Sequence, residues 1–545
     1  MPASLRPHER RYGDIAANKQ PCRPDAANYT CPGIVSPHLD RVAAEGIRFT
    51  SWYTSHPVCT PSRAAILTGR YPIRTGAFPG VFSPQSNDGL PHSEVTIAEK
   101  LLGAGYQTSA AAKWHLGSVT LPDGRSFLPP AFGFQSYTGI PYSHDFCPCP
   151  ESLTHTHDHK CRPDDPPCPV FEDLEVVQQP AVLDQITQRY ANATIAALLA
   201  ADKAGEPGFS YWGPQHTHHP QFARFENINA SAERGGRPND FGDSVFEVDE
   251  AIGSVFDAIR AASWSRPLVV FVTSDNGPSL IRFENGGSPG ELRCGKGTTW
   301  EGGMRVPGLV WGTPGSGVRA GAVEDQLAAS LDILPTVLGW AGVPVPDDRP
   351  IDGYDLSDLV LEGGSGVGRR SFMNFYGLTG TLQAVRLGDL KTHIYTSTWG
   401  RSPASLCELK GHPFGNYSEH PIVFDLSTDP GESSPLDESS DKYRAAVAAA
   451  RAHIVAVDCF STKDACAGHT EPACDAKNAP LTPPSPFHPW RPVCDGKPGS
   501  EGAEAPLCSA EEVEAMTMRP DDAPATIRCR PTADHVEPLT PYTFM

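Results

Sequence analysis

Long apolar runs are missing from this sequence. It has no uninterrupted apolar stretch of about 18 residues, the length that a membrane-spanning helix requires. The opening residues, MPASLRPHERRYGD, also lack the apolar core of a signal peptide. We therefore expect no segment that spans a membrane, and the first residues alone do not indicate export.

Positive charge is also scarce. The 545 residues include 44 Lys and Arg against 64 Asp and Glu, which gives a formal net charge of -20. A surface that binds a phosphate backbone needs a basic excess, so we exclude nucleic acid as a partner. A small anionic substrate stays compatible, because a few basic groups can dominate the field in a cleft.

Cysteine, by contrast, is plentiful and favours an oxidising compartment. The chain has 15 cysteines. Four N-x-[ST] sequons agree with this, at Asn28, Asn192, Asn229 and Asn416. We therefore predict the secretory pathway, with a secreted or lysosomal protein, and expect that the signal peptide is encoded upstream of a truncated start.

An odd number of cysteines leaves one unpaired if all the others pair within the chain. Local groups are Cys22 with Cys31, then Cys147, Cys149, Cys161 and Cys168, then six from Cys459 to Cys529. Cys294 and Cys407 are each alone in their region and could pair, which leaves Cys59. Spacing does not fix the connectivity.

Helix-like and strand-like segments alternate between residues 40 and 370. We predict helices over 95–104, 243–262 and 330–342, and strands over 106–112, 268–272 and 305–312. The strand 268–272 is apolar without alternation, which is typical of burial on both faces. The pattern indicates an α/β fold with a mostly parallel central sheet flanked by helices, and with function at the carboxyl ends of its strands.

The pattern changes after about residue 365. Residues 383–396 and 421–432 predict antiparallel strands and turns, and residues 443–457 predict a helix. We expect a catalytic α/β domain over 1–365 and a smaller α+β domain with a four-stranded antiparallel sheet over 366–458. A Cys- and Pro-rich tail, held by crosslinks, would follow over 459–545.

The stretch HPVCTPSRAAILTGRYP places Cys59 where a turn becomes a helix. Pro61 suits the first turn, Thr60 or Ser62 could cap it, and the helix would end at Gly69. A helix N-terminus favours negative charge, and Arg63 lies one turn later, so the pattern would suit an anionic ester. A disulfide partner, a buried thiol and a reactive group are all compatible with Cys59.

The string C-T-P-S-R followed by A-A-x-L-T-G-R is similar to the signature of the type I sulfatases, closest to the arylsulfatase A branch, in the alkaline phosphatase superfamily. In that family the formylglycine-generating enzyme oxidises the cysteine to formylglycine (3-oxoalanine) before folding. The resemblance therefore implies that Cys59 is modified and that its hydrated aldehyde is the nucleophile.

Further segments resemble the family in order, over roughly residues 12–435. They are AAKWHLG with Lys113 and His115, GIPYSHD with Ser143, QHTHHPQF with His218, SDNGP with Asp275 and Asn276, and LRCGKGTTWEGGMRVP with Lys296. The resemblance implies that Lys113, Ser143, His218 and Lys296 bind the substrate, and that one calcium ion lies at Asp275, Asn276 and residue 59. Lys113 and His115 are two apart, so they face the same side of an extended chain.

The resemblance also implies a reaction, the hydrolysis of a sulfate monoester to sulfate and an alcohol or phenol. Residue 59 would attack sulfur, Asp275 would help to accept its proton, and His218 or Lys296 would protonate the leaving oxygen. His115 would then deprotonate the covalent intermediate, while Arg63 and Lys113 steady the nucleophile. The substrate would be a sulfated small molecule, glycolipid or glycan.

The N-terminus departs from the family pattern. The family's first strand ends in D-D-x-G-Y-G-D, whereas RRYGD (10–14) matches only its end, and His8 and Glu9 take the places of the paired aspartates. We expect a truncated gene model, and a real short product is the competing hypothesis. The alternative functions are a phosphate or phosphonate monoester hydrolase, or an inactive protein that binds sulfated glycans.

Two histidine segments need an interpretation. THTHDHKC (154–161) is expected to be a solvated loop, because no complete set of metal ligands is evident. His216 is in step with His218 and is a second candidate for the site.

Overall fold

The computed structural model describes residues 33–148, 166–236, 238–368, 370–398, 402–464 and 543–545. Outside these ranges lie His8, Glu9, the RRYGD motif, Asn28, the THTHDHKC tract, and the cysteines at 22, 31, 149, 161 and from 466 onward. Within the described ranges, no helix combines the length and the apolar character needed to cross a bilayer.

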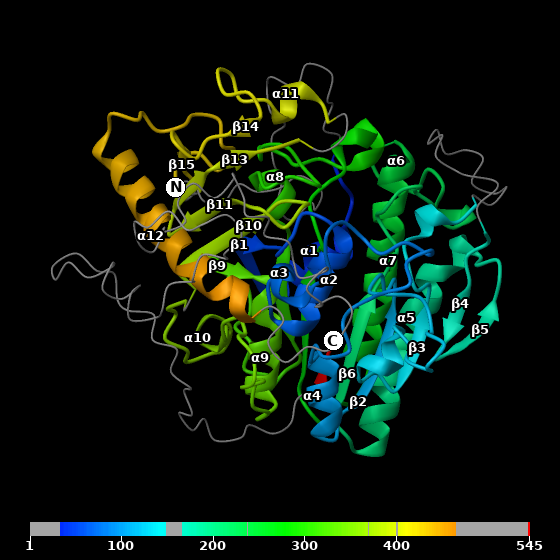
Figure 1. Ribbon diagram of the computed structural model, residues 1–545. Coiled ribbons are helices and arrows are strands. Elements are labelled where there is room, and N and C mark those ends of the chain that lie inside the picture. Colours follow the sequence, from blue (N-terminus) through cyan, green and yellow to red (C-terminus); the bar gives the residue numbers. More distant parts are fainter. Residues whose placement is uncertain (1–32, 149–165, 237, 369, 399–401, 465–542) are drawn as a thin grey trace, which may run out of the picture.

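A ten-stranded sheet forms the centre of the molecule (Figure 1). Its strands lie in the order β5 (Glu175–Gln178), β4 (Val170–Glu172), β3 (Ser136–Gly139), β2 (Gln107–Ala112), β6 (Gly208–Gly213), β16 (Thr543–Phe544), β7 (Leu268–Thr273), β8 (Gly308–Gly312), β1 (Ile47–Tyr53) and β9 (Ala322–Ala329). Neighbours are parallel from β3 to β7 and between β1 and β9. The strand β8 is antiparallel to both its neighbours, and β4 is antiparallel to β3 and β5. The predicted α/β class with a mostly parallel sheet is confirmed.

Helices cover both faces of this sheet. One face carries α1 (Pro37–Glu45), α5 (Leu183–Ala204) and α7 (Asp240–Ala261), and the other carries α2 (Cys59–Thr68), α4 (Ile97–Gly103) and α9 (Ile333–Trp340). In β7, Leu268 and Val270 pack in the apolar cluster formed with α1, α5 and α7, and Val269 packs in the cluster formed with α2, α4 and α9. Alternate side chains of a strand point to opposite faces, so β7 is buried on both, as predicted.

The helix and strand boundaries differ from the predicted ones by a few residues. The helix α7 begins at Asp240 because the Asn239 side chain caps it by accepting a hydrogen bond from the Gly242 backbone N–H. Thr96 and Glu99 form a capping box at the start of α4. The remaining short helices are α3 (Pro72–Thr75), α6 (Ala230–Glu233), α8 (Glu301–Met304), α10 (Ser357–Val360) and α11 (Ala404–Cys407).

A second, smaller sheet lies beside the first, with α12 against it at the left of Figure 1. It contains β10 (Phe372–Tyr376), β11 (Leu382–Leu387), β12 (Leu390–His393) and β15 (Ile422–Asp425), all antiparallel, and α12 spans Asp441–Asp464. A short pair, β13 (Tyr395–Thr396) and β14 (Gly415–Asn416), adjoins it. The predicted four-stranded antiparallel sheet is confirmed.

The end of the chain contributes to the central sheet, which the sequence did not lead us to expect. Thr543 and Phe544 form β16 between β6 and β7, and Phe544 is buried in the same apolar cluster as α4 and α9.

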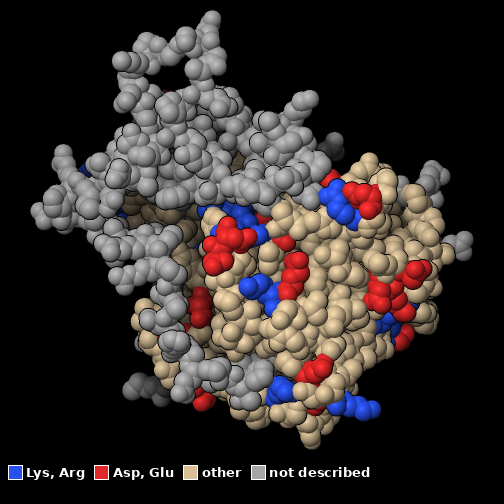
Figure 2. All heavy atoms as spheres, turned by 60° about the horizontal axis from the view of Figure 1, so that its bottom comes forward, with Lys and Arg blue, Asp and Glu red and all other residues tan. Residues whose placement is uncertain are grey.

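On the face drawn in Figure 2, acidic and basic side chains of the described residues lie in small, mixed groups.

Candidate active site

The segments that follow β1, β2, β3, β6 and β7 meet at the carboxyl edge of the central sheet. Because these strands are parallel, their ends bring residues from distant parts of the sequence together. Arg63, Lys113, His218, Asp275 and Lys296 line a cavity of about 410 Å³ there. The cavity continues between β6 and β7 toward Phe544 and Met545.

The helix α2 begins at Cys59 and is buried at all ten positions. Gly69 ends the helix in a left-handed conformation with φ 66°, which glycine adopts without steric cost. The predicted caps at Thr60 and Ser62 are wrong. Val58 is the N-cap residue, Thr60 Oγ1 donates to the His115 carbonyl, and Ser62 Oγ bonds Thr54 Oγ1. These hydroxyls fasten α2 to neighbouring loops instead of closing its first turn.

Cys59 lies among donors and has no disulfide partner. Three nitrogen donors approach its Sγ, namely Lys296 Nζ at 3.5 Å, Lys113 Nζ at 3.6 Å and Asn276 Nδ2 at 3.8 Å. Burial raises the pKa of the Cys59 thiol, but the charges of Lys113 and Lys296 outweigh it and bring the pKa well below its ordinary value. This pocket therefore stabilises negative charge at position 59.

Arg63 is directed at Asp275. Its Nε and Nη2 donate to Asp275 Oδ2 at 3.0 and 2.9 Å, and its Nη1 donates to the Lys113 carbonyl at 2.7 Å. Tyr211 OH accepts a weaker bond from the same Nη1 at 3.3 Å. Asn276 Nδ2 donates to the other carboxylate oxygen of Asp275 at 2.8 Å. Both oxygens of Asp275 are thus held in place. No motif in the sequence marked Tyr211 as a residue of the site.

Lys113 and His115 follow β2, which ends at Ala112, so strand alternation does not explain their common side. His115 has a left-handed backbone with φ 61°. The His115 side chain is buried, and its ring lies within hydrogen-bonding reach of Cys59. Burial, and then the charge of Lys113, lower the pKa of His115. The ring is therefore neutral near pH 7 and can accept a proton beside residue 59.

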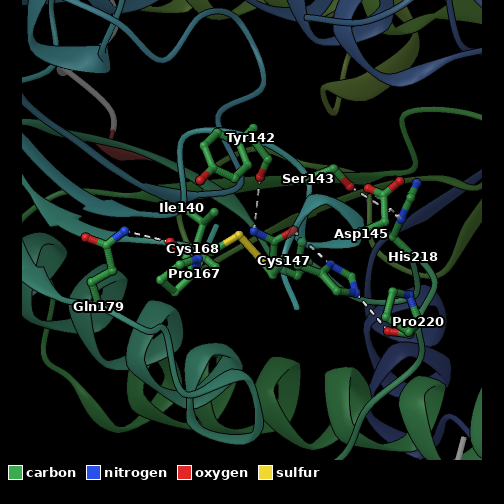
Figure 3. The surroundings of a disulfide bond; sticks show 12 residues. Ile140, Tyr142, Ser143, Asp145, Cys147, Pro167, Cys168, Gln179, His218 and Pro220 are labelled. Atoms are coloured by element: carbon green, nitrogen blue, oxygen red, sulfur yellow. Dashed lines mark hydrogen bonds and ion pairs between the residues drawn. A yellow bond between two sulfur atoms is a disulfide. The ribbon is translucent and has the colours of Figure 1, made fainter. Parts of the chain in front are cut away.

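Ser143 connects Lys113 to His218. Lys113 Nζ donates to Ser143 Oγ at 3.0 Å, and Ser143 Oγ lies 3.4 Å from His218 Nδ1. Asp145 points toward His218 in Figure 3, with Oδ1 at 3.8 Å from Nδ1, and its Oδ2 lies 3.8 Å from His219 Nε2. The motif GIPYSHD predicted Ser143, and the motif QHTHHPQF predicted His218. Asp145 and His219 lie in the same two motifs, but the sequence did not mark them as residues of the site.

His216, the second candidate, makes structural contacts. Its Nδ1 bonds Thr187 Oγ1 at 2.9 Å and its Nε2 bonds the Phe222 carbonyl at 2.9 Å. Both ring nitrogens are thus engaged away from Cys59, and burial lowers the pKa of His216 to about 3. His216 lines the cavity but keeps no free ring nitrogen, so a role for it in the site stays a prediction.

Lys296 is positioned by bonds to two other loops of the site. Its backbone N–H donates to the Pro278 carbonyl at 2.8 Å, and the Gly297 N–H donates to the Pro57 carbonyl at 2.9 Å. A disulfide joins Cys294 to Cys407, as the sequence suggested. A second disulfide joins Cys147 to Cys168, within the predicted local group. Each bridge fastens a segment that carries residues of the site.

Buried charges link the Lys296 segment to the second sheet. Lys391 Nζ of β12 lies 2.9 Å from Glu301 Oε1 and 3.1 Å from Glu432 Oε1, and all three side chains have 0% exposure. His393 Nε2 bonds the same Glu432 oxygen at 2.6 Å. The charge of Lys391, and then that of His393, lower the pKa of Glu432 to about 2 although burial opposes them. The second sheet is therefore part of the support of the site.

Comparisons with known proteins agree with this geometry. The sulfatase family model matches residues 23–343, and the model for the C-terminal region of aryl-sulfatase matches residues 368–459. Arylsulfatase A of Homo sapiens is 41% identical over 430 residues, which span 76% of this chain and 80% of that protein. N-acetylgalactosamine-6-sulfatase of Mus musculus is 35% identical over 466 residues, which span 80% of this chain and 82% of that protein.

A solved structure shows the same fold. The crystal structure of the PsFucS1 sulfatase from Pseudoalteromonas sp. superimposes with a TM-score of 0.67 at 24% identity, and the match covers 83% of this chain and 89% of that one. The resemblance found in the sequence motifs thus extends over both sheets. The chain belongs to the sulfatase family and is a sulfuric ester hydrolase.

Proposed function

We propose that this chain hydrolyses a sulfate monoester of a phenol or sugar hydroxyl, with an aldehyde made from Cys59 as its reactive group. The observation that carries the proposal is the position of Cys59, unpaired and buried at the start of α2, with two ammonium groups within 3.6 Å of its sulfur. Sulfatases generally use formylglycine and a divalent metal ion. The hydrated aldehyde supplies an oxygen nucleophile together with a second hydroxyl that later releases sulfate.

The timing of the modification follows from burial. Cys59 is only 2% exposed, so an oxidising enzyme cannot reach it in the folded protein. We infer that the formylglycine-generating enzyme acts on the chain before it folds. The described disulfides and the exposed sequon residues Asn192, Asn229 and Asn416 support a route through the secretory pathway, to the outside of the cell or to the lysosome.

The cationic residues bind the substrate's charge. Lys113 and Lys296 flank residue 59 and hold the sulfate oxygens, whose charge grows in the transition state. His115 accepts a proton from residue 59, since its ring is buried, neutral and in contact with that residue. Lys296 or His218 protonates the leaving oxygen. Burial lowers the pKa of His218, and a bound sulfate beside it would raise that pKa again.

Asp275 and Asn276 fit a hard cation, because a carboxylate and an amide oxygen are ligand types that calcium prefers. We propose that they hold one calcium ion next to residue 59, with Arg63 fixing the direction of the Asp275 carboxylate. The ion would polarise the ester and help to ionise the nucleophile. His8 and Glu9, which match the paired aspartates of the family, lie outside the described residues.

We propose the following division of labour along the chain. Residues 1–365 carry the catalytic groups, and residues 366–458 form a smaller domain that supports Lys296 through Lys391 and the Cys294–Cys407 disulfide. Residues 459–545 form a Cys- and Pro-rich tail, whose last residues lie in the central sheet.

The test uses the full chain, secreted from cells that contain the formylglycine-generating enzyme. We expect the peptide around position 59 to show the mass loss of a thiol converted to an aldehyde, and the protein to turn over aryl sulfate faster than aryl phosphate. Cys59→Ala should abolish turnover. Preference for the phosphate would indicate a phosphomonoester or phosphonate hydrolase, and binding of sulfated glycans without turnover would indicate an inactive binding protein.

A further inference from the structure

The hydroxyl of Thr60 joins the start of α2 to the segment that follows β2. Its Oγ1 donates to the His115 carbonyl at 2.7 Å and accepts a hydrogen bond from the Phe82 backbone N–H at 3.2 Å. We propose that Thr60 is a positioning residue, whose hydroxyl holds the backbone of His115 in the conformation that directs the imidazole at residue 59. The inference rests on the proposed function, in which that imidazole accepts a proton.

The backbone of His115 is the reason that this support matters. Its φ of 61° lies in the left-handed region, which residues other than glycine seldom adopt and keep only where the surroundings hold them. The His115 N–H donates to the Pro141 carbonyl at 3.0 Å, and the His115 carbonyl accepts the bond from Thr60. The donor to this carbonyl is a side chain, so one substitution can remove it without changing the backbone.

The bond between Thr60 and His115 is shielded from water. The two residues are 1% and 2% exposed. A hydrogen bond is stronger where water cannot compete, and a buried carbonyl that loses its donor is costly. The side chain of Thr60 is β-branched, and its Oγ1 is engaged on both sides, by His115 and by Phe82. The hydroxyl is therefore a rigid link between α2 and the His115 segment.

The direction of the imidazole connects this link to the reaction. The ring lies within hydrogen-bonding reach of Cys59 and meets Phe146 edge-on, with ring centroids 6.5 Å apart. Thr60 is the next residue after position 59, so the link couples the reactive group to its proton acceptor through one covalent neighbour. Proton transfer needs heavy atoms about 2.6–3.2 Å apart, so a displacement of about 1 Å would slow it.

The first turn of α2 leaves this hydroxyl available. Val58 is the N-cap residue, and the side chain of Thr60 does not close the turn. Thr68, at the other end of α2, shows the ordinary alternative, because its Oγ1 donates to the Ala64 carbonyl of the same helix at 2.8 Å. The hydroxyl of Thr60 reaches the residue that accepts the proton, whereas that of Thr68 stays within the helix.

The test compares variants of the secreted full chain, made in cells that contain the formylglycine-generating enzyme. Thr60→Val removes the hydroxyl and keeps the shape of the side chain. We expect kcat for an aryl sulfate, per molecule that carries the aldehyde at position 59, to fall about tenfold or more, with KM within about twofold of the wild type. Mass spectrometry of the peptide around position 59 supplies the aldehyde fraction. Thr60→Ser keeps the hydroxyl and should restore kcat to within about threefold.

Thr68→Val is the matched control, because it removes a buried hydroxyl from the same helix and should leave kcat unchanged. A double-mutant cycle shows whether Thr60 acts through His115. In a His115→Ala background, Thr60→Val should cost no further kcat. Additive losses would overturn the proposal. Equal kcat in Thr60→Val and Thr68→Val would also overturn it, as would a loss in Thr60→Ser as large as that in Thr60→Val.

Crystal structures of the two valine variants test the link without turnover. In Thr60→Val we expect the His115 ring to move away from residue 59, and in Thr68→Val we expect it to stay in place. A wild-type protein that carries no aldehyde, or that hydrolyses no aryl sulfate, would contradict the proposed function. An unmoved His115 ring in Thr60→Val would contradict the positioning role alone.

Discussion

At position 59, two ammonium groups and one amide surround a single atom. The low pKa of the thiol reports what this pocket does to any atom placed there, because Lys113 and Lys296 stabilise a negative charge against the effect of burial. An oxygen atom at the same position would be stabilised in the same way. Individual lysines should therefore matter to turnover more than to the fold.

Lys296→Met tests this at one residue. The change keeps the length of the side chain and removes its charge, so we expect kcat/KM for an aryl sulfate to fall by about 10²–10³-fold, as for the loss of one preorganised electrostatic contact. The control is Lys442→Met, at a lysine whose side chain is 52% exposed. Equal kcat/KM in both variants would contradict the role of Lys296.

His216 and His218 form a matched pair two residues apart. His218→Gln should lower kcat/KM by about 10²-fold or more, because a group beside the reacting atoms is lost. His216→Gln breaks bonds to Thr187 and Phe222, so it should cost about 1–3 kcal/mol of unfolding free energy and leave the kcat/KM of the folded fraction near that of the wild type. Kinetics and urea unfolding of both variants decide, and a reversed pattern would contradict the assignment.

The motifs predicted which segments meet, but not how each side chain is used. Cys59, Lys113 and Lys296 lie in motifs whose order resembles the family, and the structure brings them together. The pairing of Arg63 with Asp275 spans 212 residues and depends on packing, which no local pattern contains. His219 and Asp145 each lie next to a more conspicuous neighbour, and their closeness is a property of the fold alone.

At the scale of elements, the long apolar and amphipathic segments were predictable and the orientation of strands was not. The apolar residues at helical spacing along α7 and the apolar run of β7 both result from burial. The structure confirms the predicted helix and the predicted strand. The antiparallel direction of β8 follows from its connections, which its own residues do not encode. The two-residue β16 is too short for any periodicity to mark it.

The contact between β12 and α8 supplies a prediction at this scale. Lys391→Met leaves Glu301 and Glu432 buried without their shared cation, so we expect a loss of about 3–5 kcal/mol of unfolding free energy. Lys442→Met, which breaks an ion pair at an exposed lysine, should cost at most about 1 kcal/mol. Urea denaturation of both variants measures the difference. Equal losses would show that the buried cluster does not hold the two elements together.

At the scale of the whole molecule, buried histidines make stability depend on pH. Burial lowers the pKa of His56 and of His453 to about 4. In the unfolded chain these groups take up protons below about pH 6.5, and in the folded protein only below about pH 4. The unfolding free energy therefore falls as the pH drops through this window. Asp249 opposes the trend, because burial raises its pKa to about 6.

We expect the unfolding free energy to be lower at pH 5 than at pH 7, and each such histidine contributes about 2 kcal/mol to the loss. Urea titrations at the two pH values measure it. His56→Gln should reduce the difference between pH 7 and pH 5, whereas His420→Gln, at a 73% exposed side chain, should leave it unchanged. An unfolding midpoint that does not move with pH would contradict this account.

The position of β16 has a consequence for how the chain is made. Thr543 bonds Gly208 across 335 residues of sequence, and β6 and β7 become neighbours of β16 only when this last segment arrives. A ribosome delivers residues in order, so most of the polypeptide has been made while two inner strands, β6 and β7, still have unpaired edges. Such edges recruit other extended chains. Chaperones that hold nascent chains should therefore stay bound to this one until β16 has been made and has paired with β6 and β7.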